Sequence, residues 1–379
     1  MKTFPLFKVH VPIKEALCNI ENVFDSGYIN EGVEVSRLTV ELQRHLLAKQ
    51  LILTNSCTSA LTLAMKLVGV GPNTDVVTTP MTCIATNVPI VSSGARIVWA
   101  DVDREHGMID PDSVRRCITD RTKAIIAVAW AGTAPDLNAL LNICYDHKIK
   151  LILDAAHAFG AEYENMPIHM SAHYTTYSFQ AIKHFTTGDG GALVCNNKDD
   201  YERSKSLKWF GLDREQAKDS RGDWKGQQWD VDIEEAGFKF NMNNVSAAIG
   251  LSQLPYIGEI LKKHRENATI YNEELQHCKN VVPNWIQTLG GSSHWVYAVH
   301  VENELNRNVL LKALNDEGIM AGLVHVPNDE YTCFKNFAKD LPGVREFSQK
   351  QFALPCGWWL NSDDIRYIAH RVSELARTL

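Results

Sequence analysis

The sequence contains no long apolar run. No stretch approaches the roughly 18 or more consecutive apolar residues that a membrane-spanning helix needs. The first residues, MKTFPLFKVHVPIKEALC, also lack the uninterrupted apolar segment of a signal peptide. We therefore expect a soluble, cytoplasmic protein that has no membrane partner.

Cysteine pairs of the kind that bind zinc or form a disulfide framework are missing too. The nine cysteines are an odd number, they are thinly spread, and no two of them form a CxxC pair. Such thiols are expected to be free, buried and inert in a reducing compartment. We therefore expect neither disulfides nor a metal site.

Repeats, low-complexity tracts and blocks of like charge are also absent, so the whole chain should fold. Its 379 residues exceed the length at which a single hydrophobic core usually stops growing, which favours two domains. The 45 acidic and 38 basic residues give a formal charge of −7, and this charge repels phosphate polymers. Nucleic acid is therefore not an expected partner.

Short β-rich runs alternate with helix-like stretches from about residue 35 to residue 200. This alternation is typical of a mainly parallel sheet covered by helices, so we expect an α/β fold. A seven-stranded sheet is predicted, with strands over 51–54, 75–79, 95–101, 123–130, 149–154, 173–179 and 191–196.

Helical periodicity occurs both between these strands and beyond them. It predicts helices over 58–69, 135–148, 243–254, 257–278, 306–318 and 362–379. Pro255 is expected to end the helix over 243–254. Since a strand over 294–301 lies among the last helices, we expect a large α/β domain over 1–250 and a smaller α+β domain over 251–379.

Asp154 ends an apolar strand and is followed by two alanines and His157. Because the carboxyl ends of parallel strands face the ligand crevice, both side chains are candidates for the site. Taken alone, an N-cap aspartate with a satisfied histidine is the simpler interpretation.

Lys183 lies after one predicted strand and before another, in YSFQAIKHFTTGDGGALV. The glycines at 188, 190 and 191 indicate a tight reversal with positive φ, which would immobilise the backbone near Lys183. A lysine held in this way can form a Schiff base, although most lysines are simply solvated.

Thr58 and Ser59 lie where a strand turns into a helix, so their hydroxyls and free backbone N–H groups suit a phosphate. Ser178 could add a third hydroxyl.

A phosphate-binding site, an acid at a strand end and a rigid lysine together match the needs of pyridoxal 5′-phosphate (PLP). Asp154 would keep the pyridinium protonated, and Lys183 would act as the imine-forming amine and then as general acid/base.

The sequence also resembles the DegT/DnrJ/EryC1/StrS aminotransferases, which make amino sugars. The resemblance runs over nearly the whole chain. It is carried by six motifs in order: SGYINEGVEVSRLTVEL (26–42), NSCTSALTLAM (55–65), PMTCIATNVPIVSSGARIVWADVD (80–103), LDAAHAFGA (153–161), YSFQAIKHFTTGDGGALV (177–194) and GFKFNMNNVSAAIGLSQL (237–254).

The resemblance implies the type I PLP-enzyme fold and assigns several residues. Lys183 corresponds to the lysine that binds the cofactor, and Asp154 to the partner of its pyridinium. His157 is expected to contact the ring or its O3′. The phosphate binders correspond to Thr58, Ser59 and Ser178, with Asn241 reaching the phosphate of a neighbouring subunit and Lys239 as its rival. A homodimer with shared active sites follows from this.

The family resemblance also implies the reaction. Dehydratase relatives have histidine in the lysine position, whereas this chain has Lys183, so transamination is expected. The predicted activity moves an amino group from L-glutamate to a nucleotide-linked 4-keto-6-deoxyhexose, for amino-sugar or O-antigen (lipopolysaccharide) biosynthesis. A 3-keto sugar or cyclitol, a PLP-binding regulatory protein without turnover, and a nucleotide-binding module without PLP are the alternatives.

By analogy with the family, the sugar side is expected near the N-terminal segment 1–35, at Ile29, Asn30 and Glu31, and Lys239 is a further candidate for binding the substrate. Two motifs depart from the family. Cys83 stands where the family usually has a stacking aromatic, so it either leaves room for a bulkier substrate or only packs. In HVPNDEYTCF, which differs from the usual Pro-x-His segment, His325, Asn328 and Asp329 are the candidates for binding sugar hydroxyls, or they form an ordinary polar loop.

Overall fold

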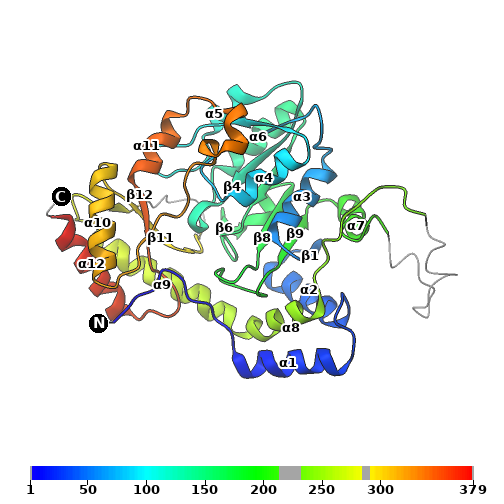
Figure 1. Cartoon of the computed structure of the whole chain (residues 1–379), viewed down its shortest axis with the longest axis horizontal. Coiled ribbons are helices and arrows are strands. Elements are labelled where there is room, and N and C mark those ends of the chain that lie inside the picture. Colours follow the sequence, from blue (N-terminus) through cyan, green and yellow to red (C-terminus); the bar gives the residue numbers. More distant parts are fainter. Residues whose placement is uncertain (1, 213–231, 284–290, 378–379) are drawn as a thin grey trace.

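Figure 1 shows the computed structural model, which describes residues 2–212, 232–283 and 291–377. A large layered α/β part occupies most of the molecule, and a smaller part lies beside it (Figure 1). The smaller part is built from the helices α9 (Ile257–Leu275), α10 (Glu304–Asp316) and α12 (Ser362–Ala376) and the strands β11 (Tyr297–His300) and β12 (Gln351–Leu354). Both chain ends lie at this smaller part, where Phe4 pairs with Ile319 in an isolated β-bridge.

The large part is organised around a seven-stranded sheet in the order β1-β9-β8-β5-β4-β2-β3. The strands β8, β5, β4, β2 and β3 run parallel, whereas β9 runs antiparallel to both β1 and β8. Their bounds are β1 (Leu51–Thr54), β2 (Asp75–Thr78), β3 (Arg96–Trp99), β4 (Thr122–Val128), β5 (Lys150–Asp154), β8 (Tyr174–Ser178) and β9 (Gly191–Cys195). All seven predicted strands are confirmed.

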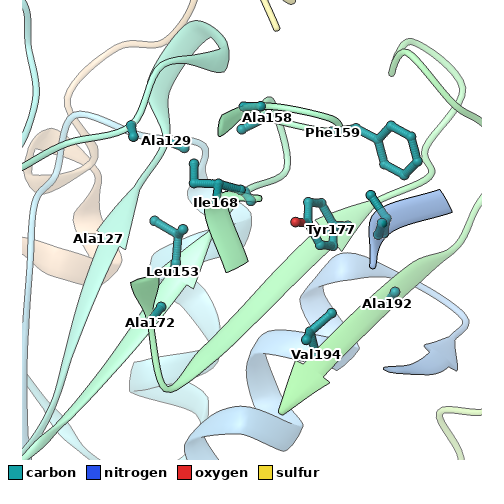
Figure 2. Packing of buried hydrophobic residues seen from close by; sticks show 14 of the residues in the cluster. Ala127, Ala129, Leu153, Ala158, Phe159, Ile168, Ala172, Tyr177, Ala192 and Val194 are labelled. Atoms are coloured by element: carbon teal, nitrogen blue, oxygen red, sulfur yellow. The ribbon is translucent and has the colours of Figure 1, made fainter. Parts of the chain in front are cut away.

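Strand β5 shows why the sheet is buried on both faces. Leu151 and Leu153 pack into one hydrophobic cluster, and Ile152 between them packs into another. Because successive strand residues point to opposite faces, a near-continuous apolar run fills both layers. Figure 2 shows the first of these clusters, with Leu153 lying near Ala172 and with Tyr177 near Phe159.

Helices cover both faces of this sheet. Leu63 of α3 (Cys57–Leu67) and Ile90 of α4 (Ile84–Ser92) belong to one cluster. Leu38 of α2 (Val33–Leu46), Leu140 of α6 (Leu137–His147) and Ala247 of α8 (Asn244–Gln253) belong to the other. The large part also contains α1 (Ile13–Asp25), α5 (Pro111–Cys117), α7 (Lys198–Leu207) and the short hairpin β6 (Glu162–Tyr163) with β7 (Met166–Pro167).

The smaller part has its own core. Its strands β10 (Val282–Pro283), β11 (Tyr297–His300) and β12 (Gln351–Leu354) form an antiparallel sheet. Val299 and Phe352 from this sheet pack with residues of α9 (Ile257–Leu275), α10 (Glu304–Asp316) and α12 (Ser362–Ala376), while α11 (Pro342–Lys350) lies between β11 and β12 in sequence. Phe4 joins the same core, so the N-terminal segment is fastened to this part.

The chain passes from the large part to the smaller one through helical segments that follow each other without a loop. Helix α8 ends at Gln253, as expected, but a 3₁₀ turn (Leu254–Tyr256) that contains Pro255 leads directly into α9. Proline is tolerated there because the first residues of a helical segment do not use their N–H groups. Helix α9 contributes Leu261 to a cluster of the large part and Tyr271 to the core of the smaller one. A division at residue 250 stays a prediction.

Among the described residues, no helix combines the length and the apolar character required to cross a bilayer.

Candidate active site

Asp154 lies at the carboxyl end of β5 with only 4% of its surface exposed. Its carboxylate accepts hydrogen bonds from Thr86 Oγ1 at 2.7 Å and from the backbone N–H of Ala156 at 3.0 Å. Thr86 is itself 2.9 Å from the hydroxyl of Thr82. Burial raises the pKa of Asp154 despite these donors and the nearby Lys183. A cationic partner would therefore be strongly favoured at this carboxylate.

Lys183 is carried by the loop that joins the antiparallel strands β8 and β9. The loop is closed by hydrogen bonds from the N–H of Phe179 to the carbonyl of Gly190 and from the N–H of Thr187 to the carbonyl of Phe179, both 2.9 Å. Gly188 has φ +81°, as the sequence predicts.

Positive φ was expected at two further glycines of this loop, and the structure differs there. Gly190 and Gly191 do not have positive φ, and glycine is needed at both positions because other atoms pack closely against them. A Cβ on Gly190 would lie 2.1 Å from Thr187 Oγ1, and one on Gly191 would lie 2.5 Å from the backbone N of Cys57.

The charge of Lys183 is set by burial and by acidic neighbours. Burial lowers the pKa of its amine to about 8, although the carboxylate of Asp154 and the thiols of Cys57 and Cys83 favour the ammonium form. A substantial fraction of the amine is therefore neutral near pH 8, and a neutral amine is the form that attacks an aldehyde. The structure thus brings the predicted residues Lys183, Asp154 and Cys83 to one place.

His157, which is buried, and His325, which is half-buried, form a pair. Their Nε2 atoms are 3.3 Å apart and their rings lie within 20° of parallel. Burial lowers the pKa of both, with a nearby Lys183 charge acting in the same direction, and brings that of His325 to about 3. Both rings are therefore neutral at pH 7. Nδ1 of His157 is buried and has no hydrogen-bond partner among the described residues, so it offers a polar atom to a ligand.

The predicted phosphate binders lie around the start of α3. Ser56 caps this helix by accepting a hydrogen bond from the N–H of Ser59 at 3.1 Å, and Thr58 lies in the same first turn. Ser178, at the end of β8, is paired in register with Gly191, which lies against the helix start. First-turn N–H groups have no acceptor within their own helix, so they are available to an anion.

Asn241 and Lys239 lie beside the end of β1. Asn241 pairs with Thr54 in an isolated bridge, and its amide donates to Asn30 Oδ1 at 3.1 Å. Lys239 donates to the Asn241 side chain and stands 3.7 Å from the ring centroid of Trp209. Within one chain, Asn241, Lys239 and Asn30 therefore form a second polar group at the end of β1. In the sheet, β9 lies between this group and Ser178 at the end of β8.

The segment around Ile29, Asn30 and Glu31 is held against this second group. Asn244, at the start of α8, donates its amide to the carbonyl of Tyr28 at 2.9 Å. Its side-chain oxygen accepts from the N–H of Gly32 at 3.1 Å, and its backbone N–H donates to the carbonyl of Ile29 at 2.9 Å. Glu31 forms an ion pair with Lys208. The predicted sugar-side residues are therefore ordered by α8.

Asn328 and Asp329 are engaged with other parts of the protein. The Asn328 amide donates to the carbonyl of Thr82 at 2.8 Å and accepts from Asn87 at 2.9 Å. Asp329, whose side chain is only 2% exposed, is paired with Arg345. The Asn328 side chain therefore supports the start of α4, next to Cys83, whereas that of Asp329 is tied to α11, and sugar binding by either stays a prediction.

Sequence reasoning missed three residues of this site. Trp295 lies with its ring centroid 3.7 Å from Lys183 Nζ and 4.0 Å from the His157 ring. Thr86 donates to Asp154, and Cys57 is close enough to influence Lys183. Thr86 and Cys57 belong to quoted motifs and could have been chosen as polar groups near strand ends, whereas nothing local marks Trp295.

The donor set suits PLP on structural grounds. Asp154 is a buried carboxylate with raised pKa, His157 has an orphan ring nitrogen, Lys183 has a lowered pKa, and Thr58 lies at an open helix start. These groups correspond to a pyridinium partner, a ring contact, an imine-forming amine and a phosphate seat. The arrangement can therefore support amine chemistry on a carbonyl group.

Comparison with known proteins agrees with this geometry. The sequence profile of the DegT/DnrJ/EryC1/StrS aminotransferase family matches residues 12–373. The chain is 31% identical over 373 residues to a protein of Shewanella sediminis (strain HAW-EB3) named UDP-4-amino-4-deoxy-L-arabinose--oxoglutarate aminotransferase, with 94% of each chain covered. It is 29% identical over 369 residues to the dTDP-4-dehydro-2,3,6-trideoxy-D-glucose 4-aminotransferase of Saccharopolyspora spinosa, covering 96% of this chain and 95% of that protein.

Solved structures show the same similarity. The crystal structure of AtS13 from Actinomadura melliaura superposes with a TM-score of 0.91 at 34% identity and 99% coverage of both chains. The sugar aminotransferase CalS13 from Micromonospora echinospora superposes with a TM-score of 0.90 at 31% identity, covering 98% of this chain and 99% of that one.

Proposed function

Because the chain belongs to the DegT/DnrJ/EryC1/StrS aminotransferase family, we propose that it is a PLP-dependent aminotransferase that moves an amino group from L-glutamate to a nucleotide-linked keto-sugar. The acceptor we propose is a nucleoside-diphosphate 4-keto-6-deoxyhexose, used for amino-sugar or O-antigen biosynthesis. The protein would act in the cytoplasm as a homodimer with shared active sites. The observation that carries this proposal is the placement of Lys183, with its pKa near 8, beside the buried carboxylate of Asp154.

The residues that would hold PLP come from three elements. Asp154 at the end of β5 would face the pyridinium nitrogen, and His157 would offer its free Nδ1. Thr58 and Ser59 at the start of α3 would hold the phosphate together with Ser178. When bound, the cofactor supplies an electron-withdrawing ring that stabilises negative charge at the substrate carbon next to nitrogen.

Lys183 would move the proton at that substrate carbon. Its amine has a pKa near 8, so it can take up and return a proton close to physiological pH, where an ordinary lysine is fully charged. Asp154 stays close enough to favour the ammonium form once the proton has been taken. The hydrogen-bonded loop from Phe179 to Gly190 fixes the backbone that carries the lysine.

The sugar side is proposed at the segment 29–31 and at His325. Asn244 holds the segment through its hydrogen bond to Tyr28, and Nε2 of His325 is 3.3 Å from Nε2 of His157. Neutral imidazole and amide groups at such positions suit sugar hydroxyls. The two relatives named above carry 4-amination in their names, and one is named for oxoglutarate, which is the keto acid that glutamate leaves behind.

Visible absorption of the purified protein with PLP tests the proposal. The bound cofactor should give a yellow band, and L-glutamate should convert it to the colourless amine form of the cofactor. Keto-sugars linked to different nucleotides should then restore the yellow band, and the product's amino position distinguishes 4-amination from 3-amination. A chain that binds PLP but does not respond to glutamate contradicts the donor, and a chain that gives no band at all contradicts the role of Lys183.

A further inference from the structure

Trp295 contacts both basic side chains at the centre of the site. The Nζ atom of Lys183 lies 3.7 Å from the centroid of the indole ring. The imidazole of His157 lies parallel to the same indole, with 4.0 Å between ring centroids and 14° between ring planes. The function proposed above uses Lys183 and His157 but assigns no part to Trp295.

The indole is held in this position by several contacts. Its Nε1 donates to the carbonyl of Ile182 at 2.9 Å, so it is tied to the loop of the lysine. The backbone N–H of Trp295 donates to the carbonyl of Ala131 at 3.1 Å, in the short 3₁₀ turn (Trp130–Gly132) that follows β4. Phe7 from the N-terminal segment stacks on it at 4.8 Å. With 4% of its surface exposed, Trp295 has little freedom to turn away.

The two residues before Trp295 are also fixed. The N–H of Ser293 donates to Gly132 O at 3.0 Å, its hydroxyl donates to His157 O at 3.1 Å, and its carbonyl is 3.0 Å from Nε2 of His184. His294 has φ +46°, a left-handed conformation that is unfavourable for a residue with a Cβ. Such a conformation persists only where the surrounding contacts impose it. Here the hydrogen bonds of Ser293 and Trp295 impose it, and the indole lies against Lys183 as a result.

We propose that Trp295 is a positioning residue for Lys183. Its indole face receives the ammonium group of the lysine whenever the amine is not bonded to the cofactor, and it keeps the His157 ring in the orientation that presents Nδ1 to the site. An indole attracts a cation more strongly than a phenyl ring does, and the attraction grows where water is excluded. The inference rests on the proposed function, because it concerns the resting state of the cofactor-binding lysine.

The indole is one of several groups that act on the charge of Lys183. The carboxylate of Asp154 and the thiols of Cys57 and Cys83 favour the ammonium. The imidazoles that respond to the lysine's charge come from the loop after β5, from its own loop and from the C-terminal part, namely His157, His184 and His325. None of the hydrogen bonds and ring contacts given above for Trp295 involves Asp154, Cys57 or Cys83, so a substitution at Trp295 leaves these acidic neighbours of the lysine unchanged.

The test measures Lys183 without measuring turnover. Full-length protein freed of cofactor is mixed with PLP at a series of pH values, and the rate at which the yellow complex forms is recorded. This rate follows the neutral fraction of the lysine, so the wild type should show an inflection near the pKa of about 8. The matched control is Trp99→Phe, which changes a buried tryptophan in β3 that packs against Phe334, outside the contacts described here.

Removal of the ring should make the lysine easier to deprotonate. Trp295→Leu should lower the inflection by about one pH unit, a roughly tenfold fall in the proton affinity of the amine, because the cation–π contact that favours the ammonium is lost. Trp295→Phe should lower it by a smaller amount, because phenyl retains part of the attraction. Trp99→Phe should leave it unchanged.

An inflection that stays in place or rises in Trp295→Leu overturns the inference while leaving the proposed function intact. If circular dichroism shows that this variant is unfolded, Trp295→Phe decides alone, and an unshifted inflection in it overturns the inference. A wild-type protein that forms no yellow complex at any pH overturns the proposed function, and the positioning role falls with it.

Discussion

Among the described residues, the carboxyl of Asp154 accepts from one side-chain donor, Thr86, and from one backbone N–H. We predict that Asp154→Asn keeps the fold, because asparagine is nearly isosteric and can still accept from Thr86. The variant loses the negative charge that would pair with the cofactor nitrogen. Since a hydrogen bond to a charged group is worth about 1.5–3 kcal/mol, the glutamate half-reaction should slow by about tenfold to a hundredfold.

Stopped-flow absorbance of the bound cofactor measures that half-reaction. Asp136→Asn is the control, since Asp136 is an exposed carboxylate that caps α6 by accepting from the N–H of Ala139. Equal rates in wild type and Asp154→Asn would remove Asp154 from the mechanism.

The same substitution should change the pH dependence of Lys183. Asp154 favours the ammonium form of the lysine, so its charge opposes the lowering caused by burial. In Asp154→Asn the pKa of Lys183 should therefore fall below the wild-type value of about 8. The rate at which the yellow complex forms, followed from pH 6 to 10, should rise at lower pH than in wild type. A rise at higher pH would contradict the arrangement of charges described here.

Single residues also show where sequence reasoning reaches its limit. Asp154 and Lys183 could be predicted because the ends of strands and the glycines after them leave local signals. Trp295 could not, because its contact with Lys183 joins residues from different parts of the molecule. Only the fold brings the segment before β11 to the 3₁₀ turn that follows β4.

At the scale of elements, the phosphate seat depends on the contact between β9 and α3. A Cβ on Gly191 would lie 2.5 Å from the N of Cys57 and 2.6 Å from the C of Ser56. Gly191→Ala should therefore push the start of α3 away from the sheet, weaken PLP binding at least tenfold and lower the melting temperature. Fluorescence titration with PLP and thermal unfolding measure the two effects.

Gly258→Ala provides the matched control for that substitution. Gly258 lies in α9, and a Cβ there has no neighbour within 4 Å. Alanine in a helix interior is favoured over glycine by about 1 kcal/mol, so this variant should be as stable as wild type or more so. Unchanged PLP affinity in Gly191→Ala would show that the start of α3 does not hold the phosphate.

The strands of the large sheet could be predicted from their apolar runs, whereas several helices, among them the amphipathic α1, α2 and α11, were not predicted. The seven strands were found because both faces of the sheet are buried, which makes each strand a compact apolar run. Helix α4 was missed because Pro89 lies inside it and few of its residues follow an amphipathic pattern. The strands β6 and β7 have two residues each, too few to show alternation.

At the scale of the whole molecule, histidines that are buried or half-buried make the fold sensitive to acid. Burial lowers the pKa of His264 and His294 to about 4, and that of His325 to about 3. In the unfolded chain the same groups bind protons near pH 6.5. Their contribution to stability is therefore complete above pH 6.5 and is lost as the pH falls toward 4, because the unfolded state then binds more protons.

Urea unfolding of the cofactor-free protein between pH 4.5 and 7.5 measures this dependence. Each such histidine should steepen the fall in unfolding free energy by up to about 1.4 kcal/mol per pH unit. His264→Asn, which can still donate to the carbonyl of His294, should flatten the dependence, whereas His370→Asn on the surface of α12 should not. A stability that does not change from pH 7 to 5 would contradict the burial of these rings.

The place of β1 in the sheet has a consequence for how the protein is synthesised. Leu51 pairs with Val194 of β9, so β1 leaves the ribosome long before its partner has been translated. At about 5–20 residues per second, the apolar residues of β1 and α3 wait on the order of ten seconds for β9. During that interval the nascent chain exposes an unpaired strand edge, which is a binding site for chaperones. The cofactor seat can close only after Gly191 has emerged, so the ribosome-bound chain should be unable to retain PLP until then.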